Sequence, residues 1–168
     1  MAVQLSKKVC LLGDFAVGKT SLVRRFVYNL FDDKYISTIG VKVSRKAVMA
    51  SADDVTANLT LMLWDLAGGT EFTKVQTNYF RSAAGAILVC DITRPDTFDT
   101  LIEYRHRLFE VSPNAKIIIA ANKSDLVNDP AIPYPRLEEL STSLQAPYLV
   151  TSAKSGQNTE QLFLQLGQ

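Results

Sequence analysis

The chain has 168 residues, 47% of them hydrophobic, which is enough for one well-buried core but too short for two ordinary domains. We therefore expect a single domain over residues 1–168. Its 18 Lys and Arg residues nearly balance its 17 Asp and Glu residues, which excludes the broad basic field typical of nucleic-acid binders. The sequence has no apolar stretch of membrane-spanning length, no secretion signal and no glycine at position 2 for myristoylation, so we expect a cytoplasmic chain without a membrane anchor.

Apolar runs alternate with segments of helical period, without internal repeats or linker-like tracts, and this alternation predicts an α/β fold. All-apolar runs such as residues 117–119 favour strands covered on both faces. We expect a six-stranded, mostly parallel sheet with one antiparallel edge strand and five helices on both faces. In chain order, we first expect a strand at 8–12, a helix with inward-facing Val23, Phe26, Val27 and Leu30, a hairpin with arms at 40–50 and 56–64, and a short helix. Three strand–helix pairs follow: a strand at 86–90 with a helix at 98–110, a strand at 116–121 with a helix at 136–145, and a strand at 148–150 with a helix at 159–166.

Residues 13–20, Gly-Asp-Phe-Ala-Val-Gly-Lys-Thr, follow the first expected strand and open the first helix, as a Walker A loop does. Lys19 can neutralise the β- and γ-phosphates of a nucleotide, and the Thr20 hydroxyl can ligate Mg²⁺. A glycine-containing turn that precedes Lys-Thr by chance is the alternative, and four fixed positions make that rare. Phosphate oxygens can be cradled by backbone N–H groups of the loop, at Phe15, Ala16, Val17 and Gly18.

Two motifs after later strands predict selection of guanine. Asp125, in Asn122-Lys123-Ser124-Asp125, can accept hydrogen bonds from N1–H and the N2 amine of guanine, a pair that adenine lacks. Leaving such a carboxylate unpaired can discriminate by about 10⁴-fold. In Thr151-Ser152-Ala153-Lys154, the N–H of Ala153 can donate to guanine O6. Alone, the first motif is also typical of turns and the second of helix N-caps. The expected base contacts from these motifs are Asn122, Lys123, Asp125, Ser152, Ala153 and Lys154.

Residues 64–69, Trp-Asp-Leu-Ala-Gly-Gly, close the third expected strand. Asp65 stands where a Walker B carboxylate holds Mg²⁺, and the N–H of Gly68 can meet a γ-phosphate. A simple Gly-Gly strand terminator is the alternative. Convergence favours the site, because four strand ends carry such motifs and ligands of open α/β sheets bind at the carboxyl ends of the strands. We expect GTP or GDP with Mg²⁺.

Over almost its whole length the sequence resembles the Ras superfamily of small GTPases, and most closely its Rab family. The resemblance lies in Tyr-Ile-Ser-Thr-Ile-Gly-Val at 35–41, Leu-Trp-Asp-Leu-Ala-Gly-Gly at 63–69 and Tyr-Phe-Arg at 79–81, together with the motifs above. It implies the P-loop NTPase fold of a Ras-like G domain. The function it implies is a molecular switch that cycles between GTP and GDP.

The resemblance also implies roles for single residues. Thr38 would ligate Mg²⁺ and contact the γ-phosphate, Phe31 would pack against guanine, and Ser21 would lie near the α-phosphate. The stem of Lys123 would cover the base, and Tyr35 would join the nucleotide contacts. Judged from residue type alone, Phe31 and Tyr35 also suit structural roles as core or loop-anchor aromatics.

By the same resemblance, the candidate catalytic groups are Lys19, Thr38 and Gly68. Two switch segments, at about 32–43 and 65–81, would report the γ-phosphate to effectors, exchange factors and GTPase-activating proteins. The chain ends without the prenylatable cysteines expected of Rab proteins, so membrane attachment is not supported.

Departures from the Rab pattern predict slow hydrolysis. Gly69 and Thr70 stand where the family usually has a water-orienting Gln and a Glu, and Phe15 replaces a small residue. Glu71 is a candidate to position water instead. Val43 replaces a phenylalanine that Rab proteins commonly present to effectors, so effector identity is not implied.

Three functional hypotheses follow. The first is a slow GTPase whose hydrolysis depends on a partner, such as one that supplies an amide and an arginine. The second is a pseudo-GTPase that stays loaded with nucleotide and acts as an interaction module. The third, an ATP-using P-loop enzyme, is opposed by Asp125. Other chemistry-bearing residues are expected to be structural: buried Cys10 and Cys90, and a solvated His106 without a carboxylate partner.

Overall fold

The computed structural model contains one sheet with strand order β2-β3-β1-β4-β5-β6. The pairing of β2 with β3 is antiparallel, and the other pairings between the described strands are parallel, as expected. The structure describes residues 3–32, 40–52, 55–69, 74–127 and 134–167. The strands are β1 (Val3–Leu12), β2 (Val41–Ala52), β3 (Val55–Leu66), β4 (Gly85–Asp91), β5 (Lys116–Asn122) and β6 (Tyr148–Val150).

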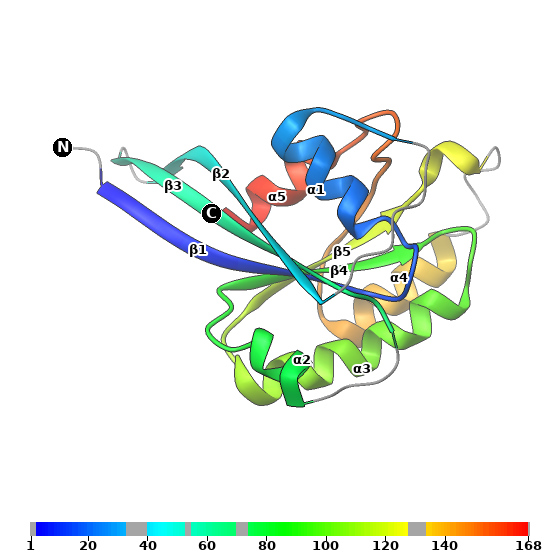
Figure 1. Cartoon of the computed structure of the whole chain (residues 1–168). Coiled ribbons are helices and arrows are strands. Elements are labelled where there is room, and N and C mark those ends of the chain that lie inside the picture. Colours follow the sequence, from blue (N-terminus) through cyan, green and yellow to red (C-terminus); the bar gives the residue numbers. More distant parts are fainter. Residues whose placement is uncertain (1–2, 33–39, 53–54, 70–73, 128–133, 168) are drawn as a thin grey trace.

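Helices cover both faces of the sheet, which confirms the predicted architecture. Figure 1 shows α1 and α5 on one face and α2, α3 and α4 on the other. Among the described residues, no helix is both long and apolar enough to span a membrane. The helices are α1 (Lys19–Tyr28), α2 (Lys74–Tyr79), α3 (Asp96–Val111), α4 (Tyr134–Leu144) and α5 (Thr159–Gly167), with a 3₁₀ turn, η1 (Ser124–Leu126).

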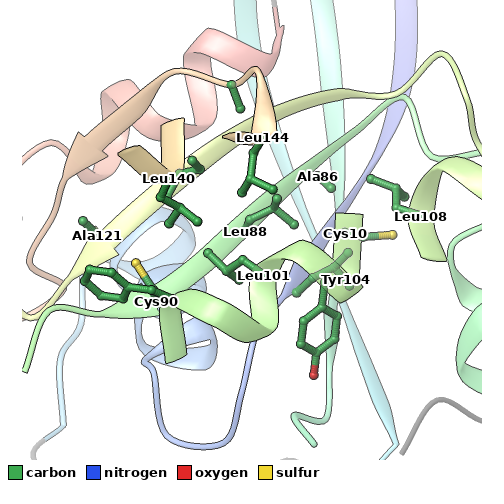
Figure 2. Packing of buried hydrophobic residues seen from close by; sticks show 14 of the residues in the cluster. Cys10, Ala86, Leu88, Cys90, Leu101, Tyr104, Leu108, Ala121, Leu140 and Leu144 are labelled. Atoms are coloured by element: carbon green, nitrogen blue, oxygen red, sulfur yellow. The ribbon is translucent and has the colours of Figure 1, made fainter. Parts of the chain in front are cut away.

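Successive residues of the central strands serve two separate cores. Val9 and Leu11 of β1 pack toward α1 and α5, whereas Cys10 and Leu12 pack toward α3 and α4. All seven residues of β4 are buried, because helices cover both of its faces. Figure 2 shows the α3–α4 side of this packing. Both thiols are free and buried, as expected, and burial raises the pKa of Cys10 to about 12.

The first strand begins earlier than residue 8. Its outer part, residues 3–7, alternates apolar and polar types and pairs with β3 in continuous register, whereas β4 joins β1 only from Val9. This part of the strand is therefore less enclosed, and Leu5 is 48% exposed. In Figure 1, β1, β2 and β3 extend beyond the layer of helices. A polar strand with one partner carries a weaker apolar signal, which explains the shorter prediction.

Two further expectations were wrong. Leu30 does not lie on the inward face of α1, because Asn29 adopts a left-handed conformation (φ 54°) and ends the helix. Leu30 is instead 63% exposed. His106 is solvated, as expected, but it has a carboxylate partner: its Nε2 lies 3.1 Å from Oε1 of Glu110, one helical turn along α3.

Candidate functional site

A cavity of about 380 Å³ lies at the carboxyl ends of the strands, beside the N-terminus of α1. It brings together every predicted nucleotide contact among the described residues except Ser152. Tyr35, Thr38, Thr70 and Glu71 lie outside the described residues. Four lining residues were not predicted to contact nucleotide: Arg24, Leu30, Asp32 and Leu126.

Side chains from two later loops hold the backbone of the Walker A loop in place. The carbonyl of Phe15 accepts a hydrogen bond from Nη2 of Arg94 at 2.6 Å, and that of Ala16 accepts one from Nζ of Lys123 at 2.6 Å. The carbonyl of Val17 accepts one from Nδ2 of Asn122 at 2.9 Å. Because the carbonyl and N–H of a trans peptide point in opposite directions, the N–H groups that follow these carbonyls point away from the three side chains. Such a row of unopposed amides suits an anion.

The side chain of Lys19, at the end of the Walker A loop, folds back onto that loop. Its Nζ donates to the carbonyls of Gly13 at 2.6 Å and Asp14 at 2.9 Å, and the residue is only 6% exposed. Burial lowers the pKa of Lys19 to about 8, although nearby Asp65 and Asp14 act in the opposite direction. A buried ammonium with few compensating charges favours an anionic neighbour.

Thr20 and Asp65, both predicted to ligate Mg²⁺, are in direct contact. The Thr20 hydroxyl donates to Oδ2 of Asp65 at 2.5 Å. The other carboxylate oxygen, Oδ1, is buried and has no hydrogen-bond partner among the described residues. Burial raises the pKa of Asp65, so its ionised form calls for a compensating cation.

This donor set fits Mg²⁺. The described residues contain no group of three or more His, Cys, Asp or Glu side chains that could hold a metal ion. Mg²⁺ at a nucleotide needs only one or two protein ligands, because phosphates and water supply the others. A hydroxyl beside a buried carboxylate oxygen without a partner matches that requirement.

Asn122 connects three segments at the other end of the cavity. Its amide donates to the Walker A loop, and its Oδ1 accepts a hydrogen bond from the hydroxyl of Thr151 at 3.1 Å. Ser152 does not line the cavity; its hydroxyl donates to Oδ1 of Asp125 at 2.7 Å and fixes that carboxylate. Ala153 lines the cavity and is 4% exposed. The predicted base-reading groups therefore lie side by side.

The sequence reasoning missed Asp91, at the end of β4. Its Oδ2 lies 3.1 Å from Nε of Arg94 and 3.1 Å from Nζ of Lys123, the two cations that hold the Walker A carbonyls. Burial raises the pKa of Asp91, but hydrogen bonds from the hydroxyl and N–H of Thr93, together with Lys123, outweigh burial and leave the pKa below its ordinary value. The sequence did carry a signal for a role of Asp91 in the site: it is an acidic residue at the end of an all-apolar strand, at the same edge as the other motifs.

Gly68 and Gly69 run close to the Walker A loop and α3. A Cβ on Gly68 would lie 2.5 Å from the carbonyl carbon of Asp14, so only glycine fits this approach. The hydroxyl of Tyr104 donates to the carbonyl of Gly69 at 2.6 Å and accepts a hydrogen bond from its N–H at 3.3 Å. Burial raises the pKa of Tyr104 to about 12, so the hydroxyl stays protonated at neutral pH. Tyr104 was not predicted to take part in the site.

The doubly covered, mostly parallel sheet and the Walker A loop at its carboxyl edge define a P-loop nucleotide-binding protein of the α/β class. The model of the Ras family matches residues 8–168. The chain is 39% identical over 157 residues to Ras-related protein Rab-31 of Rattus norvegicus, covering 93% of this chain and 78% of that protein. It is 34% identical over 158 residues to GTP-binding protein ypt1 of Schizosaccharomyces pombe, covering 94% and 76%. For human Ras-related protein Rab-30 the identity is 38% over 160 residues, covering 95% and 77%.

The chain therefore belongs to the Ras family and resembles its Rab members. It is a small GTP-binding switch protein of a family whose members hydrolyse GTP. Proteins of this family bind GTP or GDP, generally with Mg²⁺, and they bind exchange factors, GTPase-activating proteins and effectors.

Proposed function

We propose that this chain, as one domain over residues 1–168, is a guanine-nucleotide switch that hydrolyses GTP slowly and depends on a partner for rapid turnover. The observation that carries the proposal is the backbone of Gly69. It is held by Tyr104 at the edge of the nucleotide cavity, at the position where the family usually has a water-orienting glutamine. A glycine has no side chain with which to orient water.

The chemistry divides among three groups of residues. The Walker A amides, Lys19 and Ser21 bind the phosphates, while Thr20, Asp65 and Thr38 hold Mg²⁺, which neutralises phosphate charge when bound. The base is selected by Asp125 and by the N–H of Ala153. Further base contacts come from Phe31, the stem of Lys123, Asn122 and Lys154, while Ser152 acts through its hydrogen bond to Asp125.

For hydrolysis, Lys19, Thr38 and the N–H of Gly68 are the groups that would stabilise charge on the γ-phosphate. The water nucleophile lacks an orienting amide from this chain. A partner that supplies an amide and an arginine would complete the site, and Glu71 is the candidate within the chain. We expect Glu71→Ala to slow hydrolysis if Glu71 has that role.

Effector contacts are proposed for switch I, at about 32–43, and switch II, at about 65–81. Val43 on β2 is 42% exposed and offers a smaller apolar surface than the phenylalanine common in Rab proteins. Effectors of this chain would therefore differ from those that need the larger ring.

A pseudo-GTPase is the second candidate, favoured by Phe15. This ring is 54% exposed beside the phosphate-binding loop, where the family usually has a small residue. Its bulk would hinder the entry of an arginine from a partner. Under this alternative, the protein stays loaded with nucleotide and acts as an interaction module.

Single-turnover phosphate release from the GTP-loaded chain tests the proposal. We expect a rate no faster than about 10⁻⁴ s⁻¹ for the chain alone, the order known for Ras without its activating protein. Rapid hydrolysis by the isolated chain would contradict the dependence on a partner. Undetectable turnover under every condition, with nucleotide retained through purification, would establish the pseudo-GTPase instead.

A further inference from the structure

Arg25 of α1 binds the loop that follows β6, far away in the sequence. Its Nε donates to the carbonyl of Ala153 at 2.7 Å, and its Nη2 donates to the carbonyl of Lys154. The remaining nitrogen, Nη1, donates to Oδ1 of Asn29, the residue that ends α1, at 3.1 Å. One guanidinium thus ties two consecutive carbonyls of the loop to the helix that begins at the Walker A motif.

Ala153 is the residue of this loop whose N–H is predicted to meet the base. Ala153 lines the cavity, and its N–H donates to no other described residue. A buried N–H without a partner is costly unless a ligand accepts from it. The carbonyl of the same peptide, that of Ser152, accepts from the N–H of Gly156 at 2.8 Å, and Arg25 holds the next two carbonyls, so the backbone is held on both sides of Ala153.

The two base-reading groups are held by different side chains. Asp125 is fixed by the hydroxyl of Ser152, whereas Arg25 holds the two peptides that follow Ala153. If the bound base is guanine, Asp125 accepts hydrogen bonds from N1–H and the N2 amine, and the Ala153 N–H donates to O6. Changes at Arg25 should therefore affect recognition at O6 and leave recognition at N2 unchanged.

We propose that Arg25 is a positioning residue that holds the N–H of Ala153 for the 6-oxo group of the purine, and so slows nucleotide release and favours 6-oxo purines. The inference rests on the guanine-nucleotide function proposed above. It assigns a specificity role to a residue that need not touch the nucleotide.

The test is a cycle of protein variants and nucleotides. Arg25→Met removes all donors and keeps the aliphatic stem. GDP is compared with 6-thio-GDP, in which sulfur replaces O6 and accepts hydrogen bonds weakly, and with inosine diphosphate, which lacks the N2 amine. Dissociation rates are measured for each combination by displacement with excess GDP in the presence of Mg²⁺.

Arg105→Met is the matched control. Arg105 also donates through Nε to a loop carbonyl, that of Leu144 at 2.9 Å, but from α3 to the end of α4, outside the nucleotide cavity. Thermal unfolding of both variants separates loss of the fold from loss of positioning. Should Arg25→Met fail to fold, Arg25→Lys, which keeps one cationic donor, takes its place with an intermediate effect expected.

For Arg25→Met we expect GDP release to be about tenfold faster, which is the order of a lost hydrogen bond to a charged group. The factor by which 6-thio-GDP leaves faster than GDP should shrink. The factor by which inosine diphosphate leaves faster than GDP should stay as in the wild type. Release at the wild-type rate, or equal shrinkage of both factors, would overturn the proposal. A wild-type chain that binds no guanine nucleotide would instead refute the function on which the inference rests.

Discussion

The aromatic ring of Phe15 lies against the position that a side chain at residue 69 would take. A Cβ on Gly69 would lie 3.2 Å from Cζ and 3.3 Å from Cε2 of Phe15, which is tighter than ordinary contact. Gly69 also has a φ of +148°, which strains any other residue. The two departures from the Rab pattern are therefore complementary: one position has gained a ring where its neighbour in space has lost a side chain.

We predict that restoring glutamine at position 69 alone does not restore rapid hydrolysis. In Gly69→Gln the new side chain meets the Phe15 ring and a strained backbone, so turnover should stay at or below the wild-type rate. The double variant Phe15→Gly/Gly69→Gln frees that space and should hydrolyse GTP at least about tenfold faster than either single variant, a gain of about 1.4 kcal/mol in transition-state stabilisation. Single-turnover phosphate release measures all four proteins. Additive effects of the two changes would show that the positions are not coupled.

Gly68→Ala should weaken GTP binding more than GDP binding. The added methyl group would lie 2.6 Å from the Phe15 nitrogen as well as against Asp14, and it would push the 68–69 segment away from the loop. Only the γ-phosphate is expected to reach the Gly68 N–H, so affinity for a slowly hydrolysed GTP analogue should fall by about tenfold or more while that for GDP changes little. Competition with a fluorescent nucleotide gives both values. Equal losses for the two nucleotides would argue against the Gly68 contact.

Asp125→Asn should exchange the preferred base. The amide can donate to the 2-oxo group of xanthine but cannot accept both bonds from guanine. We expect GDP affinity to fall by about 10³-fold or more and xanthosine diphosphate to bind in its place. Asp96→Asn, an exposed change on α3 outside the cavity, is the control and should bind GDP as the wild type does. An Asp125→Asn variant that keeps its preference for GDP would contradict the assignment.

Asp91→Asn should destabilise the fold in a pH-dependent way. Native contacts lower the pKa of Asp91 below its ordinary value, so its ionised form is the one that they stabilise. That contribution is complete above the unfolded-state pKa and is lost as the pH falls through the lower folded-state value. At pH 7, removing a buried charge that faces Arg94 and Lys123 should cost about 2–4 kcal/mol.

Urea unfolding of the wild type and Asp91→Asn at pH 7, 5 and 3.5 measures this difference, which should stay constant between pH 7 and 5 and shrink at pH 3.5. Asp99→Asn breaks an exposed pair with Arg136 and serves as the control, for which we expect little change. A difference that grows toward low pH would have the wrong sign for this account.

Most of the fold could be predicted because its signals are local. Runs such as residues 117–119 are apolar over consecutive positions, so both the strand and its cover by helices were visible in the sequence. The early start of β1 was missed because residues 3–7 pair along one side only and carry polar residues. The end of α1 was missed because the left-handed Asn29 is a matter of backbone conformation rather than of apolar spacing.

The candidate site divides in the same way. The Walker A loop and the two base motifs are contiguous, so they could be predicted as segments, and the structure brings their described residues around one cavity. Arg25, Asp91 and Tyr104 could not be found so readily. Arg25 and Tyr104 act by contacts with residues distant in the sequence, and an arginine or tyrosine in an ordinary helix carries no motif, while Asp91 was marked only by its place at the end of an apolar strand. Predicting such positioning residues requires the tertiary structure.

The central claim is that this cavity selects guanine nucleotides in the presence of Mg²⁺. The most direct measurement is to denature the purified protein, identify the released nucleotide by chromatography, and repeat the experiment after treatment with a chelator. We predict about one equivalent of GDP or GTP per chain, with much faster loss once Mg²⁺ is removed. Adenine nucleotides retained as tightly as guanine nucleotides, or no Mg²⁺-dependent occupancy, would contradict the account.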